Sequence, residues 1–182
     1  ATCKTFNYDP DSCKIQYLTY NGSTISYLSN WVSNASLVSN TYDGMGVGLF
    51  NKPVTTVSDS SSSNLANITH LIFSNATTSI TLSRLSSYTR LTDITLGNNM
   101  KSISSFTSGP DSLKIHVPNL KSWLQADVSS SAFKTGQQLY VNGELLEGSL
   151  TIPTDVTRVG TYNLAGYSYL TDIIIPKHVE NL

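Results

Sequence analysis

Short segments with an apolar–x–apolar pattern recur along the chain from about residue 70 onward. Three of the five segments are followed directly by proline, and their last apolar residues are separated by 23, 21, 35 and 23 residues. Apolar strands that recur about every 20–29 residues are typical of a leucine-rich solenoid, whose stacked turns share one continuous core. The segments are Leu71–Phe73, Ile94–Leu96, Ile115–Val117, Leu150–Ile152 and Ile173–Ile175.

This pattern predicts a mainly β fold with short helices. Residues 67–182 are expected to form a leucine-rich repeat solenoid of about five turns, with a period of ~23 residues. The longer interval indicates an inserted helix and hairpin at residues 118–148. Apolar residues between Leu120 and Val128 fit the helix, and the Asn142-Gly143 pair favours a tight hairpin turn, because both residues tolerate a positive φ.

Residues 1–66 lack the repeat, and we expect a small α+β or β region that caps the solenoid. Alternating apolar and polar residues predict strands, since successive side chains of a strand point to opposite faces. The expected elements are strands at 5–8 and 14–20, a hairpin turn at Asn21-Gly22 leading to 25–27, a short amphipathic helix at 26–39 and a glycine-rich loop at 42–48.

The composition narrows the function classes. Charged residues make up 13% of the chain and the net charge is −1, which argues against a nucleic-acid-binding face. No apolar run approaches the ~18 residues of a membrane helix, so no membrane insertion is expected. Ser, Thr and Asn are abundant and the ten tyrosines outnumber the other aromatic residues. Such a composition suits an extracellular, cell-surface or virion-surface protein.

Residues that could carry chemistry are few and scattered. His70, His116 and His178 fall on different solenoid turns, and we expect no metal site from them. Asp93 and Asp172 each precede a strand several turns apart and are expected to be solvated turn residues. No nucleophile elbow is present and the glycines at 44–48 lack the context of a phosphate loop. We therefore expect neither an enzyme nor a bound cofactor.

The two cysteines, Cys3 and Cys13, lie close together in the sequence. In an oxidising compartment they could close a short loop as a disulfide. Two unpaired thiols are the alternative.

The central residues of the five apolar–x–apolar segments form the best candidate binding surface. They point away from the core, one per solenoid turn, and stacking brings them into an extended column. This outward column consists of Ile72, Thr95, His116, Thr151 and Ile174. Plain exposure to solvent, or packing against the N-terminal region, is the alternative.

The segment SLTIPTDVTRVGTYNLAGYSYLTDIIIP resembles the repeat of the BspA-like leucine-rich proteins. The stretch from Lys114 to Pro153, with its Val-Pro strand, Trp-Leu helix and Asn-Gly-Glu-Leu hairpin, is similar to an inserted cassette of that family. The resemblance implies a non-enzymatic surface protein used in adhesion or recognition. Similar repeats also occur as modules in phage tail and particle-surface proteins.

Two hypotheses follow. In the first, the solenoid face of an adhesion or recognition module binds a protein or a glycan on a cell surface. In the second, the chain is a structural virion or tail component that contacts neighbouring subunits or the host. Self-association into a homo-oligomer is compatible with either hypothesis.

Overall fold

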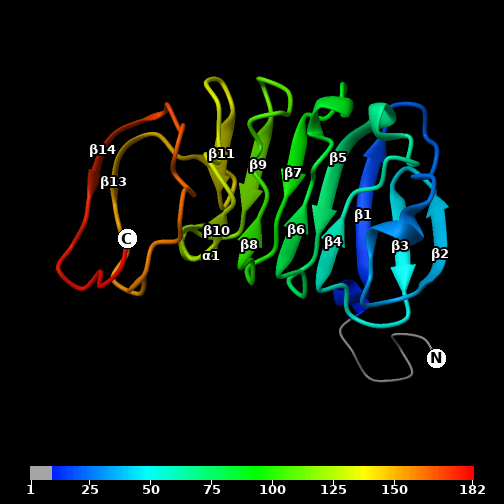
Figure 1. The fold of residues 1–182 in the computed structure, drawn as a ribbon, viewed down its shortest axis with the longest axis horizontal. Helices are drawn as coiled ribbons and strands as arrows, with labels where there is room; N and C mark the ends of the chain where they lie inside the picture. Colours follow the sequence, from blue (N-terminus) through cyan, green and yellow to red (C-terminus); the bar gives the residue numbers. More distant parts are fainter. Residues whose placement is uncertain (1–9) are drawn as a thin grey trace.

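A computed structural model describes residues 10–182 as an elongated stack of β-strands, with β2 and β14 near opposite ends of its long axis (Figure 1). The strands are β1 (Lys14–Thr19), β2 (Leu37–Tyr42), β3 (Gly46–Phe50), β4 (Thr56–Ser58), β5 (Ile68–Phe73), β6 (Ser79–Thr81), β7 (Asp93–Thr95), β8 (Ser102–Ile103), β9 (Lys114–Val117), β10 (Asp127–Val128), β11 (Gln138–Val141), β12 (Glu144–Leu145), β13 (Gly148–Thr151) and β14 (Leu170–Ile174). The helices are the α-helix α1 (Leu120–Leu124) and the 3₁₀ helices η2 (Pro10–Cys13), η3 (Leu28–Trp31), η4 (Leu65–Asn67) and η5 (Leu85–Ser87). The predicted fold class, a mainly β solenoid of about five turns with short helices, is confirmed.

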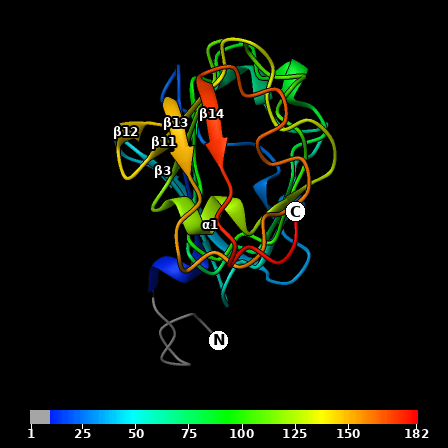
Figure 2. The same ribbon diagram turned by 90° about the vertical axis from the view of Figure 1, so that its left-hand side faces the viewer.

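Two sheets line the two sides of the stack. The outer sheet has eight strands in the order β12-β11-β9-β7-β5-β1-β3-β2, and the return sheet has four in the order β10-β8-β6-β4. Seen along the stack, the strands and the returning segments enclose the interior from opposite sides (Figure 2). The turns that begin with β5, β7 and β9 therefore each supply one strand to each sheet.

The core is a column of apolar residues in register. Leu71 lies opposite Ile94, Ile94 opposite Ile115, and Ile115 opposite Leu139 on parallel neighbouring strands. All four side chains are fully buried. Since no single turn could bury its own apolar residues, each turn is stabilised mainly by its neighbours.

The stretch expected as an insertion contributes a strand to the stack. The α1 helix and the β11–β12 hairpin lie where expected, and Asn142 and Gly143 have φ angles of 50° and 84°. However, β11 also pairs in parallel with β9 and continues the outer sheet. The hairpin strand is therefore itself part of a solenoid turn. The division of the chain at 66/67 and the insertion bounds 118–148 stay predictions.

Three predictions for the N-terminal region are wrong. The helix expected at 26–39 is replaced by the short η3 and by β2. The Asn21-Gly22 turn leads to no strand at 25–27, because β1 pairs instead with β3 and β5. The glycine-rich loop at 42–48 contains a β2–β3 hairpin. The strand expected at 5–8 lies outside the described residues.

Close packing against β3 explains why this strand contains glycines. A side chain at Gly46 would overlap the ring of Tyr17, and one at Gly48 would overlap Leu28. Both large residues are fully buried against this strand. The glycines therefore make room for core side chains, and they do not mark a flexible loop.

The strand side of the stack is interrupted after β12, whereas the return side is continuous. β13 and β14 pair in parallel in a sheet of their own. The Tyr167 hydroxyl spans the interruption: it accepts a hydrogen bond from the Leu139 amide at 3.1 Å and donates one to the Leu146 carbonyl at 2.6 Å. On the return side, the Val128 amide still donates to the Thr161 carbonyl at 2.9 Å.

Candidate functional site

The outward column is divided between two sheets. Ile72, Thr95 and His116 are direct neighbours on β5, β7 and β9. Thr151 and Ile174 are neighbours on β13 and β14, in the separate sheet. Three of the five predicted residues are therefore brought together, and the other two form a second pair.

The next residue after His116 on the outer sheet is Tyr140, which the sequence analysis did not include. Tyr140 lies opposite His116 in the parallel pairing of β9 with β11. The two rings stack with their centroids 5.1 Å apart and their planes at 26°. The sequence does contain a signal for Tyr140 as an outward residue: Leu139–Val141 is an apolar–x–apolar segment that begins 24 residues after Ile115.

Ile72, Thr95 and His116 line a groove of about 470 Å³ on the outer sheet. We call it the sheet groove. Its remaining lining residues come from β1 and the helix before it, from the ends of β5 and β9, and from the loops that follow β5, β7, β9 and β11: Asp11, Lys14, Gln16, Phe73, Ser74, Asn75, Leu96, Gly97, Val117, Pro118, Asn142 and Gly143. The volume falls within the range of roughly 300–1,000 Å³ that is usual for small-molecule sites.

Asp93 links two histidines beside the sheet groove. Its Oδ2 lies 3.0 Å from His70 Nε2, and its Oδ1 lies 2.7 Å from His116 Nε2. His70 is directly opposite Asp93, whereas His116 reaches it diagonally from β9. Diagonal contacts of this kind are within reach of long side chains on a sheet. The chain His70–Asp93–His116 therefore ties β5, β7 and β9 together.

The environment of Asp93 favours its charged form. Burial opposes ionisation, but hydrogen bonds from Thr92 and His116 and the electrostatic effect of the neighbouring His70 and His116 outweigh it, and the pKa of Asp93 is lowered. The expectation that Asp93 is a solvated turn residue is therefore wrong, because only 19% of its side chain is exposed. Asp172, at the equivalent repeat position, is exposed and bonds to the Thr171 hydroxyl at 3.0 Å.

Among the described residues, the histidines are not arranged as the ligands of a metal ion. Over residues 10–182, no group of three or more His, Cys, Asp and Glu side chains is arranged to hold a metal ion. His178 lies far from the other two in the sequence and contacts the Pro153 carbonyl at 2.9 Å. His116 hydrogen-bonds to the Asp93 carboxylate, and His70 lies within ion-pair distance of the same group.

Comparison with known proteins gives the family. The model of the BspA type leucine-rich repeat region matches residues 47–139 and 139–182, with six copies. The chain belongs to the BspA-type leucine-rich repeat family. No curated protein and no solved structure matches the chain. Leucine-rich repeat solenoids are typically interaction scaffolds, and BspA-type proteins are typically surface-associated.

The BspA-type match extends further toward the N-terminus than the strand pattern predicted. It begins at residue 47, inside β3. In the structure, β4 already pairs in parallel with β6, so the return sheet starts before residue 67. The strand pattern did not reveal this because the outer strands before β5 run antiparallel to their neighbours.

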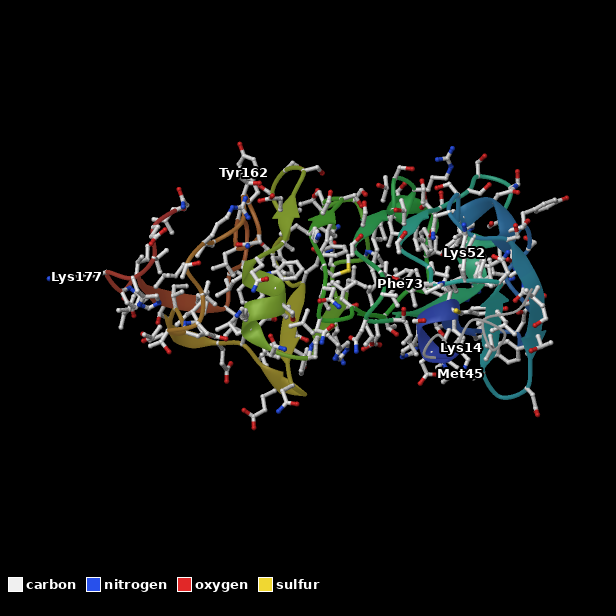
Figure 3. All side chains as sticks on the ribbon, turned by 90° about the horizontal axis from the view of Figure 1, so that it is seen from below. Lys14, Met45, Lys52, Phe73, Tyr162 and Lys177 are labelled. Atoms are coloured by element: carbon white, nitrogen blue, oxygen red, sulfur yellow. The ribbon has the colours of Figure 1, made fainter. Side chains whose placement is uncertain are left out.

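The second pair of column residues lies on the outward face of β13 and β14. Thr151 is exposed and Ile174 is 52% exposed. Ile173 pairs with the buried Leu150 and points to the opposite face. On that face, an apolar hollow of about 330 Å³ is lined by residues that include Ile152, Ile173 and Ile175. Tyr162 also borders this hollow, and its side chain, like that of Lys177, points outward in Figure 3.

Two sequence predictions remain outside these sites. Cys13 is fully buried, but Cys3 lies outside the described residues, so the disulfide stays a prediction. Within residues 10–182, no helix is long and apolar enough to cross a membrane.

Proposed function

We propose that this protein is a non-enzymatic recognition module that attaches to a partner on a cell surface through the sheet groove. The observation that supports this is the clustering of Ile72, Thr95 and His116 on the floor of one groove. These residues were selected from the repeat pattern alone, as positions that point away from the core. Their side chains are half-buried, so the floor is both accessible and held in place.

The rigidity of the groove also supports a binding role. The strands β1, β5, β7 and β9 beneath it each pair with a neighbour on both sides. The His70–Asp93–His116 chain adds side-chain links across three of these strands. A preformed surface binds more tightly because fewer side chains have to be ordered when the partner arrives.

The test compares two variants of the labelled protein. Thr95→Trp places a large ring in the sheet groove, and Thr151→Trp places the same ring at an equivalent outward position on β13, outside the groove. We expect Thr95→Trp to weaken saturable binding to cells at least about tenfold, as measured by flow cytometry, with Thr151→Trp unchanged. Circular dichroism and thermal melting establish that both variants fold.

Two results would refute the proposal. The first is that Thr95→Trp and Thr151→Trp change binding to cells equally. The second is that the protein shows no saturable binding to any cell in a test set of bacterial and host cells.

A second candidate function is supported by the apolar surface around β14. Ile173, Ile174 and Ile175 are 46%, 52% and 48% exposed. In a structural virion or tail component, this surface would contact a neighbouring subunit. Light scattering of the purified protein at several concentrations tests this candidate, and a strictly monomeric protein would contradict self-assembly.

We further propose that the region before residue 67 caps the array. β2 and β3 extend the outer sheet beyond β1, and β2 forms its last strand. Trp31 and Phe50 are buried against this end of the core. The β1–β3 end is thereby covered by apolar side chains from the chain itself.

A further inference from the structure

We propose that the sheet groove binds a neutral, hydroxyl-rich glycan chain. This inference rests on the proposed function and narrows the class of partner. Four features of the groove carry it: the pairing of its charges, its unused polar side chains, its small apolar surfaces and the absence of a free strand edge beneath it.

The ionisable side chains that line the groove have partners of their own. Lys14 Nζ lies 2.8 Å from Asp11 Oδ1, and His116 Nε2 lies 2.7 Å from Asp93 Oδ1. These pairs leave little net charge for a ligand. Anionic ligands are typically recognised by arginine or by clusters of cations, and no arginine lines this groove. A neutral ligand fits these groups better than an acidic one.

Several uncharged polar side chains face the groove with hydrogen-bonding capacity to spare. Among the described interactions, the Thr95 hydroxyl and the side-chain amide of Asn142 make no hydrogen bond, and the side-chain amide of Gln16 contacts only the sulfur of Met45, at 3.4 Å. Asn75 uses its Oδ1 to accept from the Asn98 amide at 3.0 Å. Hydroxyl and amide groups can both donate and accept, as the hydroxyls of a sugar do.

Apolar groups lie between these polar ones. Ile72 is half-buried in the floor and Pro118 is exposed at the rim. Sugar rings present C–H groups on their faces and hydroxyls around their edges. Alternating apolar and polar positions across the groove therefore complement a glycan, and small apolar surfaces between placed polar groups are usual in ligand sites.

A peptide partner fits this groove less well. Extended peptides commonly bind by adding a strand to a free sheet edge. β1, β5, β7 and β9 all have neighbours on both sides, so they offer no such edge. A peptide lying across this face would leave many of its own amides and carbonyls unpaired, which costs free energy when they are buried.

The first test uses immobilised mannan, β-1,3-glucan and chitin oligosaccharides as neutral probes, with alginate and heparin as acidic ones. We expect saturable binding to at least one neutral probe and weaker binding to the acidic probes. Thr95→Val, which removes only the groove hydroxyl, should weaken binding about five- to tenfold in calorimetry. Thr151→Val is the matched control and should bind like the unaltered protein.

Three results would overturn the inference: no binding to any neutral probe at millimolar concentration, tighter binding to the acidic probes, or equal effects of Thr95→Val and Thr151→Val.

A second test separates this inference from the proposed function. Cells that bind the protein are treated either with a mixture of mannanase, β-1,3-glucanase and chitinase, or with protease. Loss of Thr95-dependent binding after the glycan-degrading enzymes supports a glycan. Loss after protease, with binding retained after the glycan-degrading enzymes, refutes the glycan and leaves the recognition module standing. Binding that never depended on Thr95 refutes the proposed function itself.

Discussion

Asp93 has a structural role that its position in the sequence does not reveal. His70, Asp93 and His116 are each about one repeat apart, so the strand pattern places them on three separate solenoid turns. The stacking then brings them into contact, with Asp93 between the two rings. Within its own turn, each of the three residues has no partner in the sequence pattern, because the contact exists only between turns.

The lowered pKa of Asp93 leads to a prediction for stability. The pKa of the Asp93 carboxyl group is lower in the folded state than in the unfolded state, where it is about 3.9. Asp93 therefore makes its full contribution to stability above that pH. This contribution is lost as the pH falls through the folded pKa. We expect Asp93→Asn to lower the free energy of unfolding at pH 7, with the difference from the unaltered protein shrinking below about pH 4.

Urea unfolding at pH 7, 5, 4 and 3 measures this difference. Asp172→Asn is the control, since Asp172 occupies the same repeat position but bonds to the neighbouring Thr171. A difference for Asp93→Asn that stays constant across this pH range would contradict the assignment.

At the scale of elements, the solenoid strands were predictable and the connections between them were not. Leu71, Ile94, Ile115 and Leu150 are all buried, as the apolar–x–apolar pattern implies. β11 carries the same pattern, but its Asn-Gly turn indicated a hairpin, and a strand can belong to both a hairpin and a parallel stack. The apolar–x–apolar pattern does not indicate that β11 pairs both with β12 in a hairpin and with β9 in the parallel sheet.

The mispredicted helix shows a second limit. Residues Leu28, Trp31 and Val32 have helical spacing, yet only η3 forms. The polar residues around them bond to distant segments: the Trp31 indole donates to the Ser63 hydroxyl at 2.9 Å, and Asn34 donates to the Pro53 carbonyl at 2.8 Å. Asn and Ser compete with helical hydrogen bonds in this way, and a local pattern does not show which partners they find.

The Tyr167 hydroxyl makes two of the hydrogen bonds at the junction between the two strand sheets. Tyr167 is 8% exposed and its hydroxyl satisfies both the Leu139 amide and the Leu146 carbonyl. Tyr167→Phe leaves these groups without that partner, and we expect it to destabilise the protein by about 1–3 kcal/mol. Tyr162→Phe, at a residue that is 60% exposed, should have an effect near zero. Thermal and urea unfolding measure both values, and equal stabilities would contradict this role.

At the scale of the whole molecule, the two ends of the described array differ. The β2 end is built from strands that run back and forth, with Tyr17 and Trp31 buried beneath them. The β14 end presents three consecutive isoleucines that are about half exposed. Exposed apolar edge strands pair readily with other chains. The asymmetry therefore points to β14 as the surface for association.

Substitution with lysine at each end tests this asymmetry. We expect the purified chain to self-associate as its concentration rises, and Ile175→Lys to return it to a monomer, because Ile175 directly follows the edge strand β14 and a charge there opposes pairing. Val38→Lys on β2 is the control, since Val38 is 47% exposed and Ile175 is 48% exposed. Light scattering gives the mass of each variant. Self-association that survives Ile175→Lys would exclude the β14 surface.

The interruption after β12 has a mechanical consequence. On the strand side, the two sheets are joined by side-chain hydrogen bonds: those of the Tyr167 hydroxyl, and one from the Gln138 amide to the Tyr169 hydroxyl at 3.2 Å. On the return side, backbone hydrogen bonds continue without a break through Thr161 and Asn181. The return side is therefore connected through the backbone, whereas the strand side is connected only by a few side chains. If the array is pulled along its length, we expect the strand side to separate first at this junction.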